Sequence, residues 1–132
     1  MAGWFDSHCH VQEEYLPGDG AGAAGLQPVL ARAAGAGIDR LVCIGTGAVT
    51  SEQAVAVARS TAGDRTGPRA WASVGLHPHE ASRGVDEVTA LLARELAADD
   101  GAVVAVGECG LDYFYENSPD RKSTRLNSSH AL

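Results

Sequence analysis

The sequence predicts an α/β fold in which a parallel sheet is covered by helices. Short apolar segments alternate along the 132-residue chain with longer segments whose apolar residues recur every three or four positions. The short segments are apolar on both faces, as buried parallel strands are, and each strand–helix unit takes about thirty residues. This period fits either a closed barrel or an open doubly wound sheet. The expected strands cover residues 4–8, 41–44, 70–74 and 102–106, and the expected helices cover residues 26–36, 50–61 and 85–98.

The helices are predicted from their end signals and from their apolar faces. Gly37 follows the first helix as a stop signal, and Thr50 or Ser51 is expected to cap the second. Asp86 and Glu87 suit the first turn of the third helix, where carboxylates interact favourably with the helix dipole. The side chains expected to face the core are Leu26, Val29, Leu30 and Ala33, then Ala54, Val55 and Ala58, then Val88, Leu91, Leu92 and Leu96.

Composition and charge limit the classes of protein to which the chain can belong. Hydrophobic residues make up 45% and charged residues 20%, which is typical of a globular domain. No apolar run approaches the roughly 18 residues of a membrane helix, and the N-terminus does not resemble a signal peptide, so we expect a cytoplasmic protein. The net charge of −7 disfavours indiscriminate binding to a phosphate backbone, although bound divalent cations would reverse the local field. No membrane contact or obligate protein partner is indicated.

The cysteines predict neither a disulfide framework nor a thiolate zinc site. Cys9, Cys43 and Cys109 are far apart and form no Cys-x-x-Cys pair. We therefore expect three buried or half-buried free thiols.

The candidate reactive residues all follow the end of a predicted strand. In parallel α/β folds, active sites are built at this edge of the sheet. The sequence therefore predicts one site to which several strand ends contribute. The residues are His8 and His10, Thr46, His77 and His79, and Glu108 and Asp112.

His8 and His10 form a His-x-His pair at the end of the first strand. On extended backbone both imidazoles point to one face and Cys9 points to the other, so that two nitrogens can bind one ion. Histidines that only form hydrogen bonds at a strand end would give the same pattern. Asp6 is expected to share the face of the histidines, where it either orients an imidazole or is solvated.

Two further clusters follow the third and fourth strands. Glu108 either reaches water or bridges cations, and the histidine pair at another strand end favours the second interpretation. Pro78 stiffens the turn that carries His77, which is a candidate for orienting a phosphate or a water on the metal. His79 is as readily explained as a surface residue. Gly45-Thr46-Gly47 either offers backbone amides to an anion or forms a plain turn, which is the simpler interpretation.

Three motifs taken together resemble the TatD family of metal-dependent deoxyribonucleases and related hydrolases. They are DSHCH at residues 6–10, GLHPH at residues 75–79 and GECGLDY at residues 107–113. The motifs occur in the order of the family, and the resemblance extends over residues 4–119. It implies the N-terminal half, about four strand–helix units, of a TIM (β/α)8 barrel.

The resemblance also implies an activity and a set of site residues. His8 and His10 would bind one divalent ion, and Glu108 would be shared by two. His77 would lie near the substrate phosphate, and Asp112 carries over only as part of its motif. The complete protein would be a deoxyribonuclease that cleaves phosphodiester bonds of a DNA substrate with two divalent ions, Mg²⁺, Mn²⁺ or Zn²⁺.

The last residues do not continue the pattern. Residues 120–132 contain a single large apolar residue before the terminal Ala-Leu and have no helical periodicity, and the string resembles the translation of a sequencing-adapter oligonucleotide. An eight-stranded barrel takes about 250 residues. We therefore expect residues 1–119 to form a truncated TatD-like hydrolase domain, residues 120–132 to be a non-native tail, and the chain as written to be inactive.

Two other functions remain open at this point. An amidohydrolase-type metal hydrolase acting on a small molecule also begins with His-x-His on its first strand. Such an enzyme would more often have a carbamylated lysine where Glu108 lies, and no lysine occurs before Lys122. The second alternative is a truncated product without enzymatic activity.

Overall fold

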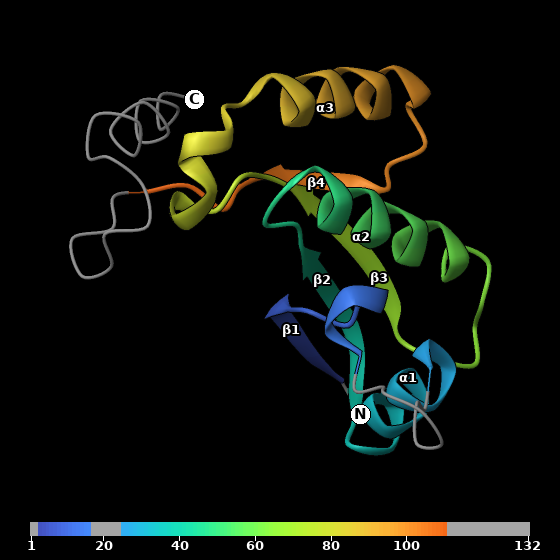
Figure 1. Cartoon of the computed structure of the whole chain (residues 1–132). Coiled ribbons are helices and arrows are strands. Elements are labelled where there is room, and N and C mark those ends of the chain that lie inside the picture. The colour runs from blue at the N-terminus through green and yellow to red at the C-terminus, as the bar shows by residue number, and fades with distance from the viewer. Residues whose placement is uncertain (1–2, 17–24, 111–132) are drawn as a thin grey trace.

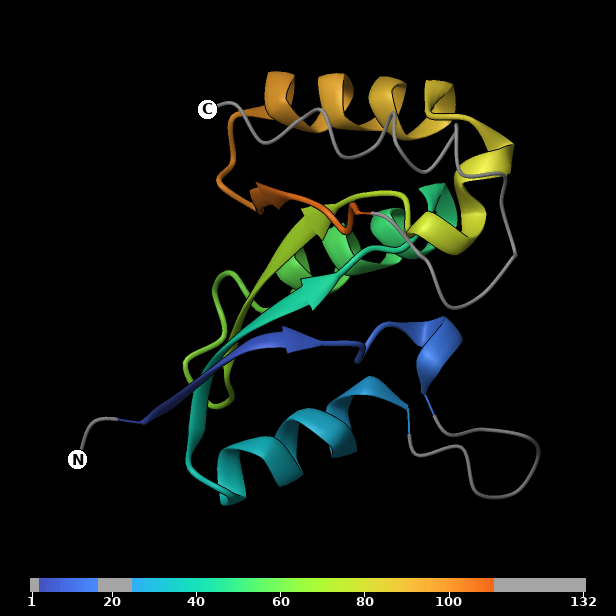
Figure 2. The same ribbon diagram turned by 90° about the vertical axis from the view of Figure 1, so that its left-hand side faces the viewer.

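A computed structural model of the chain describes residues 3–16 and 25–110. Over these residues, four parallel strands form one sheet in the order β1-β2-β3-β4, and helices connect them (Figures 1 and 2). The strands are β1 (Trp4–Cys9), β2 (Ile38–Ile44), β3 (Arg69–Val74) and β4 (Val103–Val106), and the α-helices are α1 (Leu26–Gly35), α2 (Ala48–Ser60) and α3 (Asp86–Ala98). The predicted α/β fold is confirmed, with four strands and three α-helices over the described residues.

The topology is that of part of a barrel and not of a doubly wound sheet. Each strand pairs with the strand before it in sequence, and the strand order never reverses. Leu30 of α1, Val55 of α2 and Leu91 of α3 belong to the same core, so all three helices cover the same face of the sheet. This arrangement is the N-terminal half of a TIM (β/α)8 barrel, as the sequence indicates.

The core between sheet and helices is built mainly from small and branched side chains. Ala54 and Ala58 of α2 and Ala70 and Ala72 of β3 are completely buried. Small residues on both partners allow α2 to pack closely against the sheet, with few voids. Every residue predicted to face the core from α1 and α2 is buried or half-buried.

The end of α3 differs from the prediction. Leu96, expected in the core, is 60% exposed, whereas the neighbouring Glu95 is buried. The carboxylate of Glu95 accepts hydrogen bonds from Arg59 at 2.7 Å and from Arg94 at 2.8 Å. Because a buried carboxylate is tolerated when it is paired in this way, the ion pairs and not the apolar spacing decide which side of the last turn faces inward.

The start of α2 also differs from the prediction. The helix begins at Ala48 with Gly47 as its N-cap, three to four residues before the expected cap at Thr50 or Ser51. The Thr50 hydroxyl accepts hydrogen bonds from the backbone N–H groups of Thr46, at 2.9 Å, and Gly47, at 3.0 Å. Thr50, which lies inside the first turn of α2, thus accepts hydrogen bonds from two amides just before the helix. Ser51 is buried and its hydroxyl lies against the backbone of Gly75.

The outer strands are less covered than the sequence indicates. Trp4 of β1 is 75% exposed and Val106 of β4 is 64% exposed. Over the described residues, each of these strands has a sheet partner on one side only. Short 3-10 helices that the sequence pattern did not predict follow β1, at Glu13–Tyr15 (η1), and β3, at Pro78–Arg83 (η2). No helix in the described part of the chain has the length and apolar character needed to cross a bilayer.

The segments that follow β3 and β4 lie against each other at Gly75 and Gly107. A Cβ atom placed on Gly75 would overlap the carbonyl group of Gly107, and the Gly107 N–H donates to the carbonyl of Val74 at 3.0 Å. Only glycine fits at position 75. This contact sets the position of Glu108, the next residue along the chain.

We expect Gly75→Ala to lower the free energy of unfolding by more than about 2 kcal/mol, because the backbone must move to admit the methyl group. Gly47→Ala is the matched control: its Cβ would meet no atom within 4 Å, and its backbone is extended. Urea unfolding of both variants measures the difference. Equal stability of the two would show that the β3–β4 contact is not tight.

Candidate metal centre

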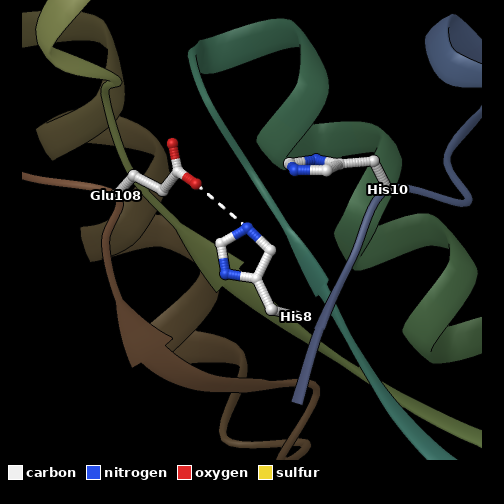
Figure 3. Close-up of side chains that lie close together, drawn as sticks. All are labelled: His8, His10 and Glu108. Atoms are coloured by element: carbon white, nitrogen blue, oxygen red, sulfur yellow. Dashed lines mark ion pairs between the residues drawn. The ribbon is translucent and has the colours of Figure 1, made fainter. Parts of the chain in front are cut away.

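Three potential metal ligands converge at the carboxyl ends of the strands (Figure 3). His8 lies at the end of β1, His10 directly follows it, and Glu108 follows β4. One ligand atom from each lies within 4.8 Å of the others, a spacing that can surround a single ion. Over the described residues, no other group of three or more histidine, cysteine or acidic side chains meets this condition.

The contact between His8 and Glu108 joins the two outer strands. His8 Nε2 lies 3.1 Å from Glu108 Oε1. Because β2 and β3 lie between β1 and β4 in the sheet, a flat sheet would keep these side chains apart. The curvature of the sheet therefore assembles the site.

The orientation of His10 is set by β2. Its Nδ1 lies 3.1 Å from the carbonyl oxygen of Ile44, so Nδ1 is the donor and carries the proton in the neutral ring. The lone pair then lies on Nε2, which is free to bind a cation. Gln12 is completely buried, and its side-chain amide donates to the same carbonyl at 2.6 Å.

His77 lies beside the other oxygen of Glu108. His77 Nε2 is 3.3 Å from Glu108 Oε2, and His77 Nδ1 accepts a hydrogen bond from the backbone N–H of His79 at 3.1 Å. In the neutral ring this acceptor role leaves the proton on Nε2, which donates to Glu108. The imidazole of His79 is half-buried, and its ring centroid lies 4.3 Å from that of His77, so His79 is not a plain surface residue.

Two neighbouring features for which the sequence left alternatives open can be described. Asp6 does not bind an imidazole: its carboxylate accepts from the backbone N–H of His8 at 3.1 Å. The amides of Gly45, Thr46 and Gly47 are already bonded, to Ser73 O and to the Thr50 hydroxyl, so this segment forms a plain turn and offers no anion site.

The cysteines are free, as predicted. Cys43 is buried, whereas Cys9 and Cys109 are partly exposed. The contact with the Cys9 sulfur, together with burial, raises the pKa of the Cys43 thiol well above its usual range. A protonated buried thiol is a poor metal ligand, so Cys43 is not a candidate donor.

Asp112 was predicted to belong to the site, and Tyr15 was not. Asp112 lies outside the described residues, and its role stays a prediction. Tyr15, which sequence reasoning missed, lies over His10 with 4.9 Å between the ring centroids. A single aromatic residue without periodicity or a motif carried no signal that could have identified it.

Comparison with known proteins shows which family and which solved structures the chain resembles. The sequence model of a family described as TatD related DNase matches residues 5–127. A 3'-5' ssDNA/RNA exonuclease TatD from Erwinia amylovora is 39% identical over 105 residues, which cover 79% of this chain and 38% of that protein. Its counterpart from Cronobacter turicensis is 45% identical over 85 residues, which cover 64% of this chain and 29% of that protein. The chain thus spans well under half the length of these relatives.

Two solved structures share the fold. An uncharacterized amidohydrolase from Saccharomyces cerevisiae superimposes with a TM-score of 0.79 at 17% identity, over 96% of this chain and 42% of that one. A hydrolase TatD family protein from Entamoeba histolytica gives a TM-score of 0.72 at 19% identity, over 96% and 44%. In both cases the chain matches somewhat less than half of a longer protein.

Replacing both His8 and His10 by alanine is expected to abolish binding of Mn²⁺ and Zn²⁺, because two of the three converging donors are lost. Isothermal titration with each ion measures the effect. His79→Ala is the matched control, since its imidazole is not part of the cluster, and it should keep its affinity. A full metal complement in the double variant would refute the ligand assignment.

Proposed function

The chain belongs to the TatD-related DNase family, and on this basis we propose that it is the N-terminal part of a divalent-metal-dependent hydrolase that cleaves phosphodiester bonds in DNA. The observation that carries the proposal is the convergence of His8, His10 and Glu108 within 4.8 Å at the carboxyl edge of the sheet. In TIM barrels this edge carries the active site.

The donor set fits a divalent ion. Two neutral imidazoles and one carboxylate suit Zn²⁺ or Mn²⁺, and Mg²⁺ would require that the remaining ligands be oxygens. Glu108 has one oxygen toward His8 and the other toward His77, so the carboxylate can be shared between two neighbouring ions. The further ligands of a two-ion site, according to the family resemblance, belong to strands that this chain does not include.

The chemistry is divided between the ions and the residues of the chain. When bound, divalent ions supply positive charge that polarises a phosphodiester and acidifies water. His8 and His10 would each offer one ring nitrogen as a donor. Glu108 supplies the negative charge, and His77 holds its carboxylate by donating from Nε2. In the proposed complex His77 lies near the substrate phosphate, as the family resemblance implies.

Nucleic acid is the proposed substrate class. The similar proteins from Erwinia amylovora and Cronobacter turicensis are named as exonucleases of single-stranded DNA and RNA. The net charge of −7 repels a phosphate backbone, and bound ions would supply the local attraction that this chain lacks. We propose single-stranded DNA as the substrate and the cytoplasm as the place of action.

The chain as written is proposed to be inactive. Two-ion hydrolysis requires both ions in fixed positions and a base for the attacking water, and the three donors here hold one ion at most. Residues that act as a unit lose their contributions together, so half of a site does not keep half of the rate. On this proposal, residues 1–119 are a truncated domain and residues 120–132 are a non-native tail.

Purified residues 1–132 are expected to show no nuclease activity with Mg²⁺, Mn²⁺ or Zn²⁺, whereas the complete protein cleaves end-labelled single-stranded DNA. Glu108→Ala in the complete protein should lower the rate by at least about a thousandfold, since it removes the shared carboxylate. A contaminating nuclease would be equally active in the Glu108→Ala preparation. Cleavage of small ester or amide substrates but not of DNA by the complete protein would favour the amidohydrolase alternative.

If residues 120–132 are a non-native tail, the genomic sequence should differ from the given sequence after Pro119. Amplification of genomic DNA across the codon for Pro119 should give a continuing barrel sequence in place of the sequence from Asp120 onward. We expect two further histidines at strand ends and a later aspartate in that continuation. A stop codon after Leu132, confirmed by independent reads, would show that the tail is genuine.

A further inference from the structure

We propose that Tyr15, held by Thr46, is a positioning residue that fixes the imidazole of His10 in its ligand orientation. The inference rests on the proposed function, because it takes His10 as a metal ligand. Tyr15 and Thr46 are not among the three converging side chains, His8, His10 and Glu108. They act on its geometry from the segment after β1 and from the turn after β2.

The first contact is between the two rings. The centroids of His10 and Tyr15 lie 4.9 Å apart, with an angle of 51° between the ring planes. The bond from His10 Nδ1 to Ile44 O holds one edge of the imidazole but leaves its faces free. The Tyr15 ring occupies one side and so limits rotation of the imidazole about its Cβ–Cγ bond.

The second contact fixes Tyr15 itself. Its hydroxyl lies 2.8 Å from the hydroxyl of Thr46, which in turn lies 3.1 Å from that of Thr50. Thr50 is buried in the first turn of α2 and is bonded to two backbone amides. The chain of hydroxyls therefore ties Tyr15 to a rigid helix end, although Tyr15 lies in a short 3-10 helix.

Burial does not account for the placement of Tyr15. The side chain is 43% exposed and lines an open cavity of about 510 Å³ together with Thr46 and Thr50. A tyrosine kept for hydrophobic stability would bury most of its ring, because the stabilisation is proportional to the area removed from water. The side chain contacts the ring of His10 and the hydroxyl of Thr46.

The turn that contains Thr46 also bonds to His77, on the other side of the metal cluster. The carbonyl of Thr46 accepts the backbone N–H of His77 at 2.9 Å, and His77 contacts Glu108. Thr46 therefore bonds to a residue on each side of the metal cluster. This position explains why a side chain without a metal donor would influence ion binding.

The first measurement uses the metal-free chain and therefore does not depend on whether an ion binds. Nitrogen-15 NMR at about pH 8.5, where histidine side chains are neutral, reports the tautomer of His10. The wild-type chain should have the proton on Nδ1. Tyr15→Phe keeps the ring but loses the hydroxyl, and both ring nitrogens of His10 should then shift toward values averaged between tautomers.

The second measurement is the affinity for Mn²⁺ by isothermal titration in a double-mutant cycle. Tyr15→Phe removes the hydrogen bond between the two hydroxyls, and Thr46→Val removes that bond together with the contact to Thr50, so each should raise the dissociation constant by about tenfold or more. The double variant should be no worse than Thr46→Val alone. Thr46→Ser keeps the hydroxyl and should bind within about twofold of wild type.

The outcomes separate this inference from the proposed function. Wild-type tautomer signals and wild-type affinity in Tyr15→Phe and Thr46→Val would overturn the positioning role, even if the His8/His10 variant loses its metal. Altered tautomer signals in both variants would support the role even if no ion binds, in which case the proposed function fails alone. If Tyr15→Phe does not fold, Thr46→Val and Thr46→Ser still test the positioning role, because serine keeps the hydroxyl that valine lacks.

Discussion

The candidate metal centre depends on the curvature that brings the end of β4 across the sheet to the end of β1. The strands are parallel, so all their carboxyl ends lie along one edge. Curvature then shortens the distance across two intervening strands until His8 and Glu108 are 3.1 Å apart. Gly75 allows the end of β4 to lie close to the end of β3, because only a residue without a side chain lets the backbone of Gly107 approach.

The ends of the middle strands, β2 and β3, orient imidazole rings of the site, whereas the ends of the outer strands, β1 and β4, carry the candidate metal donors. The end of β2 fixes the tautomer of His10 through the carbonyl of Ile44. The turn after β3 fixes the tautomer of His77 through the backbone of His79. The imidazole of His10 is thus aligned by a backbone group of another strand end, and that of His77 by the backbone of its own turn. Both rings have these orientations without a bound ion.

The side chains of the outer strands β1 and β4 are partly uncovered, which bears on the length of the protein that carries the site. Apolar side chains of β1 and β4, such as Trp4 and Val106, remain open to solvent over the described residues. The chain matches 42% and 44% of the two longer proteins that share its fold. In a closed barrel, further strands would cover such positions and face the same edge. This agrees with the proposal that the activity belongs to a longer protein.

The sequence by itself determined the α/β alternation, the core faces of α1 and α2, and the strand ends at which His8, His10, His77 and Glu108 lie, because these follow from local periodicity and motif spacing. Only the tertiary structure decided that Glu95 and not Leu96 is buried, that Asp6 bonds to backbone and not to an imidazole, and that Tyr15 lies over His10. These outcomes depend on partners far away in the sequence: Arg59 for Glu95, and Thr46 for Tyr15. Periodicity reports which face of an element is apolar, whereas pairing between distant polar groups is settled only when the elements have packed.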